Sequence, residues 1–407
     1  MEHVLNVSPY TGYVFPNETV FPWSVMIAVY PYMTGLVAGA FSVSSFYHVF
    51  GMQTYKPLAR FALLTALSFM IFVPLPLLLH LGHPERAFNA MITPHWTSAF
   101  AAFGYFAAFY VCLLVLECFF VFREDNVARA KNATGLGKLF YGAVTLWSDD
   151  VSQKARTYDH KWLFVLAVIG VPAAHGLHGY VGFVFGSLKS REWWGSDLMP
   201  VIFLFSAVVS GFALLIVLHV VTSKFRKVPI NLDCVRGLAG SLWGFLMFGV
   251  LLEGVEYANV IYKAREGIEL ILVFVSGPLF VPYFVLQFGI GAFLPIGILA
   301  FLIFGKVGGR TLVVGAVVSA LLVLMSVFMM RWNVVIGGQM ISKTLKGLLS
   351  YTPPLLGRES LLAAVFVMAA PFGLLWVLTQ LFPPWDDADK QAMPKAADNE
   401  KMPLLAE

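Results

Sequence analysis

Nine long apolar segments constrain this sequence more than any other feature. Each is long enough to cross a hydrocarbon core, which needs about 20 residues of helix. With 59% hydrophobic and 12% charged residues, the 407-residue chain has too little polar surface to coat a soluble globule. The sequence therefore predicts an all-α integral membrane protein. Its predicted spans are 24–50, 58–81, 97–122, 161–186, 197–223, 233–262, 268–304, 309–331 and 358–382.

The seventh segment leaves the number of spans open. It contains Gly277-Pro278, Pro282 and Pro295, and proline interrupts or kinks a helix. The segment is therefore either one kinked helix or two separate ones. The prediction is about nine transmembrane helices, or ten if the segment divides.

The basic residues predict the orientation. About two thirds of the 27 Lys and Arg residues fall on one side of the predicted spans. Because the more basic side faces the cytoplasm, the amino terminus is predicted to be external and the tail cytoplasmic. Because the charges fall between apolar runs, the net charge of +4 says little about nucleic acid. We expect lipid around the chain and no nucleic acid partner. Residues 135–147 are either a helix in the headgroup region or an ordinary loop.

Ionisable side chains inside a bilayer are usually kept for function. A quinone needs hydrogen-bonding groups at its carbonyls and a titratable group nearby, and imidazole suits that second role. Such residues fall near the predicted external ends of the first four helices. The predicted quinone-binding residues are His80, His83, Arg86, His175, His178 and Tyr180.

Other buried ionisable residues suggest proton transfer. Glu253 and Glu256 are three residues apart, so they share one helix face. Glu117, His48 and His219 lie near the cytoplasmic ends of their helices. We predict that these five residues pass protons, with structural contacts or snorkelling to the headgroups as the alternative. Small residues such as Gly39 and Gly240 are expected to let helices approach closely.

The three cysteines, Cys112, Cys118 and Cys234, form no CxxC or CxxCH motif. The sequence therefore predicts neither a c-type haem nor an iron–sulfur cluster in this chain, and no metal site. A b-type cytochrome remains an alternative, because His80 with His175 and His48 with His219 fall at similar predicted depths. A secondary transporter is another, since it also combines kinked helices with buried carboxylates.

Five stretches of the sequence form recognisable motifs. They are PLPLLLHLGHPER from Pro74 to Arg86, TPHWTSAF from Thr93 to Phe100, AAHGLHGYVGFVFGS from Ala173 to Ser187, MPVIFLFSAVVSG from Met199 to Gly211, and RWNVVIGGQ from Arg331 to Gln339. These motifs resemble the NrfD family of membrane subunits, which includes the polysulfide reductase membrane subunit (PsrC), HybB and DsrP. The resemblance runs over roughly residues 24–340 and, with the loop KSREWW, is most similar to the QrcD-type subunit of a menaquinone reductase complex.

The resemblance implies two four-helix bundles and a peripheral helix. The implied division is an external segment 1–23, a first bundle 24–186 that holds the quinone site, a second bundle 187–332, an external loop 333–357, a peripheral helix 358–382 and a cytoplasmic tail 383–407.

The resemblance also implies the chemistry. Electrons would pass from a periplasmic, ferredoxin-like iron–sulfur subunit to menaquinone near the periplasmic face of a bacterial inner membrane. A molybdopterin-oxidoreductase-like subunit and a multihaem cytochrome c are the further partners it implies. Protons would come from the cytoplasm. A subunit that oxidises quinol in the opposite direction is the remaining alternative.

Overall fold

The structure is a computed structural model that describes residues 21–385 except 189, 192, 265–267 and 346. The predictions for most of the external segment 1–23 and of the tail 383–407 lie outside the described residues. Within them, nine helices are long and apolar enough to cross a membrane, which confirms an all-α membrane fold with the lower of the two predicted counts.

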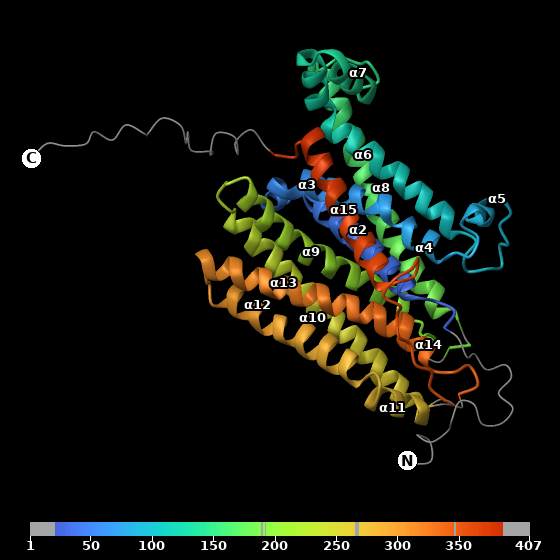
Figure 1. The fold of residues 1–407 in the computed structure, drawn as a ribbon. Coiled ribbons are helices and arrows are strands. Elements are labelled where there is room, and N and C mark those ends of the chain that lie inside the picture. Colours follow the sequence, from blue (N-terminus) through green and yellow to red (C-terminus); the bar gives the residue numbers. More distant parts are fainter. Residues whose placement is uncertain (1–20, 189, 192, 265–267, 346, 386–407) are drawn as a thin grey trace, which may run out of the picture.

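The nine spans alternate in direction along the chain (Figure 1). We call the end where the first span begins the outer end, which is the predicted external side. Two of the spans in this list consist of two shorter elements each. The spans are α2 (Val25–His48), α3 (Lys56–Phe72) with α4 (Pro74–His80), α6 (Phe103–Asn132), α8 (Gln153–Gly186), α9 (Met199–Phe225), α10 (Leu232–Lys263), η3 (Phe280–Phe293) with α12 (Leu294–Phe304), α13 (Gly309–Trp332) and α15 (Leu361–Leu381).

The seventh segment contains one break and one span. Helix α11 (Ile268–Ser276) stops where Gly277 and Pro278 follow. The chain then forms the wide-turned π-helix η3, which continues directly into α12. The break precedes the spanning part Phe280–Phe304, so it does not interrupt the helix at the middle of the membrane, as the transporter alternative would require.

The helices pack in two groups joined at the centre. We call α2, α3–α4, α6 and α8 the first bundle, and α9, α10, η3–α12 and α13 the second bundle. Helices α2 and α9 meet at Gly39 and Gly211, where a Cβ atom on either glycine would collide with the backbone of the other helix. At Gly240 an added Cβ would meet nothing within 4 Å, so the prediction of a close helix contact at this glycine is wrong. Helix α15 packs against α3 and α2.

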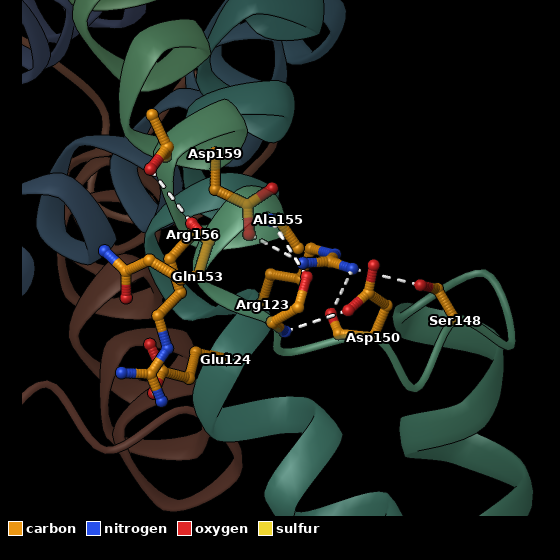
Figure 2. Close-up of polar contacts among 10 residues, drawn as sticks. Arg123, Glu124, Ser148, Asp150, Gln153, Ala155, Arg156 and Asp159 are labelled. Atoms are coloured by element: carbon orange, nitrogen blue, oxygen red, sulfur yellow. Dashed lines mark hydrogen bonds and ion pairs between the residues drawn. The ribbon is translucent and has the colours of Figure 1, made fainter.

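The inner end carries a hairpin held by charged side chains. Helices α6 and α8 extend beyond the other spans and are joined through α7 (Gly135–Val144), which lies near the end of α15 (Figure 1). Arg123 donates to Asp159 at 2.6 Å, to the Ser148 hydroxyl at 3.0 Å and to the Asp150 carbonyl at 2.9 Å (Figure 2). Of the two alternatives for residues 135–147, a helix or an ordinary loop, the structure has the helix, α7.

Short elements complete the connections between spans. At the outer end, η4 and α14 extend α13, so one continuous helical stretch runs from Gly309 to Met340. The short elements are η1 (Gln53–Tyr55), η2 (Pro84–Arg86), α5 (Asn89–Ile92), η4 (Asn333–Gly337) and α14 (Gly338–Met340).

Candidate functional site

A buried arginine lies where the two bundles meet. Arg331 on α13 is 0% exposed. Its Nη2 donates to Nε2 of His178 at 2.9 Å and also to the Ser206 hydroxyl, and the guanidinium stacks 3.8 Å from the ring centre of Phe203. A charge inside a membrane costs several kcal/mol, which such contacts offset. The arginine thus links α8 of the first bundle to α9 and α13 of the second.

The contacts of His178 fix its tautomer. Arginine only donates hydrogen bonds, so Nε2 of His178 must accept. Nδ1 therefore carries the hydrogen and donates to the Thr34 hydroxyl at 3.2 Å. Thr34 in turn donates to a backbone carbonyl of its own helix, that of Tyr30 or Pro31. The imidazole is thus held between an obligate donor and an acceptor, and has no free position for a second proton.

His175 has different surroundings. Its Nδ1 donates to the Val171 carbonyl at 2.8 Å, and its Nε2 lies 3.1 Å from the Ser42 hydroxyl. Ser42 also reaches the Ala38 carbonyl at 2.8 Å. A hydroxyl can rotate, so Ser42 either donates to a neutral His175 or accepts from a protonated one while donating to Ala38. This imidazole can gain or lose a proton without leaving a polar group unpaired.

A second polar group lies in the second bundle. Glu253 on α10 accepts from the side-chain amide of Gln287 on η3. Gln287 accepts in turn from Asn333 at 2.8 Å, and Ser326 donates to its backbone carbonyl at 2.8 Å. Arg331 interacts electrostatically with Glu253. A chain of polar side chains therefore runs across the second bundle and reaches the arginine at its junction with the first.

A cavity opens above this group at the outer end. It encloses about 1080 Å³ of empty space, including its mouth. Glu253 and Gln287 form its inner part, since they are the deepest lining residues of their helices, and Asn333 joins them there through its hydrogen bond to Gln287. The connection between α8 and α9 and the outer end of α10 surround the mouth, where charged and aromatic side chains gather. These are Trp193, Asp197, Glu256, Tyr257 and Lys263.

A smaller cavity of about 410 Å³ continues inward from the same side chains. Its lining is mostly aliphatic, as at Val209, Leu246 and Val250. Among its described lining residues, Glu253 is the only one that carries a charge. Glu253 therefore marks the change from a polar outer cavity to an apolar inner one.

The six predicted quinone-binding residues do not form one cluster. His80 lies 3.2 Å from the Ser24 hydroxyl and 3.4 Å from a Glu359 carboxylate oxygen. The side chain of His83 is 67% exposed beside Glu85. The side chain of Arg86 is equally exposed in the same turn, and Tyr180 packs its ring against Phe106 on α6. His175 and His178 face Ser42 and Thr34 of α2, and the Ser24 contact of His80 is at the start of the same helix.

The predicted proton-transfer residues fall into three places. Glu253 and Glu256 both line the outer cavity, as their spacing predicted. Glu117 and His48 are in the inner half of the first bundle. Buried polar atoms on both, Oε1 and Nε2, have no hydrogen-bond partner in the described part of the chain. His219 is also buried, on α9.

Sequence reasoning missed four residues of the site. Arg331 ends the predicted span 309–331, a position that indicates a charge at the external surface, although the helical stretch continues to Met340. Gln287 and Asn333 are polar residues within or beside apolar runs, which is the signal that would have found them. Tyr30 is the fourth: its hydroxyl is buried and unpartnered among the described residues, and its ring packs edge-on against Phe103.

Known proteins share this sequence pattern. Residues 14–343 match the family described as "Polysulphide reductase, NrfD". The chain is also 32% identical over 324 residues to a selenate reductase subunit of Mesobacillus selenatarsenatis, covering 77% of this chain and 73% of that protein.

The chain belongs to the NrfD family. Two more distant relatives agree with this assignment. One is a putative dimethyl sulfoxide reductase membrane subunit of Halobacterium salinarum, 29% identical over 58% of this chain and 51% of its own length. The other is the Hdr-like menaquinol oxidoreductase integral membrane subunit of Archaeoglobus fulgidus, 26% identical over 60% and 55%. The predicted family is confirmed, and the closer similarity to a QrcD-type subunit stays a prediction.

Proposed function

We propose that this NrfD-family chain is the quinone-reactive membrane subunit of a reductase complex in a bacterial inner membrane. Electrons pass from an external iron–sulfur subunit to menaquinone at the outer end of the first bundle. Family membership supports the role in a reductase complex, and the relative named as a menaquinol oxidoreductase subunit supports the quinone. The alternative is a complex that oxidises quinol, which would use the same site with electrons flowing in the opposite direction.

The observation that carries the proposed quinone site is the unpartnered Tyr30 hydroxyl. A buried polar group without a partner costs roughly 1–3 kcal/mol, so it indicates a ligand or water that the protein atoms do not supply. Tyr30 is about 8 Å below the start of α2, within reach of a soluble partner's electrons. A quinone carbonyl would accept its hydrogen bond. His80, which also packs against α2, is the nearby titratable group.

The proposed proton supply follows the first bundle from the inner end. Glu117 lies in its inner half, and His175 is able to hold or release a proton as Ser42 rotates. Arg331 holds His178 in place, so in this proposal His178 has a positioning role and does not transfer protons. Protons that rise from the cytoplasm cross the membrane field, and each elementary charge moved is worth about 2.3 kcal/mol per 100 mV. Quinone reduction would then charge the membrane.

The exposed outer turn suits a partner protein. His83 and Arg86 extend into solvent, and Phe88, Ile92 and Trp96 after them are also exposed. Aromatic and Arg side chains are enriched at the centres of protein interfaces. In this proposal the turn contacts the iron–sulfur subunit and not the quinone itself. A molybdopterin-type subunit and a multihaem cytochrome c would join the complex through that subunit.

Titration of the purified protein with a fluorescent quinol-analogue inhibitor tests the site. Tyr30→Phe removes only the hydroxyl, so we expect saturable quenching with a dissociation constant raised about ten-fold, the loss of one hydrogen bond. Tyr32→Phe is the matched control. It lies on the same helix but donates to the Leu324 carbonyl of α13, at 3.3 Å, and should bind as the wild type does.

Either of two results would reject this quinone site. One is wild-type binding by Tyr30→Phe, and the other is equal weakening by Tyr30→Phe and Tyr32→Phe. His83→Ala and Arg86→Ala are expected to bind the inhibitor normally, because both side chains are exposed. Absence of saturable binding to folded wild-type protein would remove the quinone function as a whole.

A further inference from the structure

The outer cavity of the second bundle has no role in the proposed quinone chemistry, although its lining is unusual for the interior of a membrane protein. Glu253, Glu256, Asp197 and Lys263 all line it. A charged or polar lining draws water into a cavity of this size, whereas an aliphatic lining leaves a cavity dry. The wall chemistry therefore indicates a hydrated space.

A buried acceptor in the inner part of the cavity points the same way. Asn333 is 1% exposed and lines the cavity, and its Oδ1 has no hydrogen-bond partner among the described residues. The amide nitrogen of the same side chain is occupied, since it donates to Gln287 and to the Pro282 carbonyl. An acceptor left free beside a cavity is satisfied by a donor within that cavity, and water is the simplest one.

The polar path ends at Glu253. Further inward the cavity lining turns aliphatic, as at Val209 and Leu246. To the side, Arg331 separates Glu253 from His178, and its positive charge opposes the passage of a proton towards the first bundle. Glu253 thus communicates with the outer solution and is closed off from both remaining directions.

We propose that this cavity is a water-filled vestibule, open at the outer end only, through which the Glu253 carboxyl exchanges protons with the external solution. The groups that face this carboxyl are Gln287 and Tyr283 from η3, Arg331 from α13, and Glu256 from its own helix. The proposal does not rest on the quinone site, which lies in the other bundle.

Two cysteines on one face of α9 test the hydration. Ile202 lines the outer cavity, and Val209, about two turns further in, lines only the inner one. Each is introduced as Ile202→Cys or Val209→Cys after Cys112, Cys118 and Cys234 are replaced by serine. A positively charged, membrane-impermeant methanethiosulfonate is added to either side of oriented membranes. We expect labelling of Ile202→Cys from the outside at least ten-fold faster than labelling of Val209→Cys.

Equal labelling at both positions, labelling from the inner side, or no labelling of Ile202→Cys in folded protein would overturn the vestibule. Met199→Cys, one turn nearer the mouth, lines the same cavity and replaces Ile202→Cys if that variant does not fold. None of these outcomes changes the inhibitor titration of Tyr30→Phe, so the two proposals fail separately.

The carboxyl itself is tested by a water-soluble carbodiimide with glycinamide, added outside. Peptide mass analysis should find Glu253 converted to its amide, and Glu117 unmodified. Glu117 is the internal control, because it is also a carboxyl within a membrane span, 2% exposed, but belongs to the first bundle. Modification of Glu117 at the rate of Glu253, or of neither residue while exposed carboxyls such as Glu85 react, would contradict the proposal.

Discussion

At the scale of single residues, two histidines that the sequence presents as a pair differ in their hydrogen-bond partners. His175 and His178 are three residues apart on α8, so both face α2. Arg331 occupies the acceptor nitrogen of His178, whereas a rotatable hydroxyl faces the corresponding nitrogen of His175. One imidazole is therefore fixed, and the other is able to change its protonation.

Nitrogen-15 NMR of histidine-labelled protein tests this difference. His178 should give the spectrum of the neutral tautomer with the hydrogen on Nδ1, assigned by its disappearance in His178→Gln. In Arg331→Met the donor to Nε2 is lost, so we expect the His178 signals to move towards a mixture of tautomers while those of His175 stay in place. A His178 ring that carries its hydrogen on Nε2 in the wild type would contradict the assignment.

At the scale of helices, the close contact of α2 and α9 depends on two glycines. Gly39 and Gly211 let the two backbones touch, which joins the first bundle to the second. Apolar run length located the spans to within a few residues at most ends, because a span is determined by its own sequence and the membrane. The face that a glycine presents depends on the neighbouring helix, so the sequence did not distinguish Gly39 from Gly240.

Alanine substitutions at these two glycines should differ strongly. Gly39→Ala forces a methyl group into the backbone of α9, and overpacking of this kind costs roughly 1–3 kcal/mol or more. Gly240→Ala meets open space and improves helix propensity, so its effect should be neutral or slightly stabilising. Thermal unfolding in detergent measures both. A Gly39→Ala protein as stable as the Gly240→Ala protein would show that the two helices are able to separate.

At the scale of the whole molecule, the spans were predicted far better than the site. The order and extent of the helices follow from apolar runs, which act locally. The site does not: Arg331, Gln287 and Glu253 come from three helices, and their meeting depends on how the bundles pack. The seventh segment shows the same limit, because its prolines revealed a break but not that the break precedes the spanning part.

An odd number of spans among the described residues places residues 21 and 385 on opposite sides of the membrane. Nine spans and an excess of Lys and Arg at the inner end together predict that residue 385, after α15, faces the cytoplasm. Alkaline phosphatase fused after residue 385 should be inactive, and green fluorescent protein fused there should fluoresce. Phosphatase fused after residue 352, in the connection before α15, should be active. Phosphatase fused after residue 308, before α13, should be inactive.

The opposite pattern would invert the protein, place the Glu253 vestibule towards the cytoplasm and remove the external partner from the proposed function. A tenth span between residues 308 and 385 would instead make the fusions after 308 and 385 differ, while leaving the earlier helices unchanged.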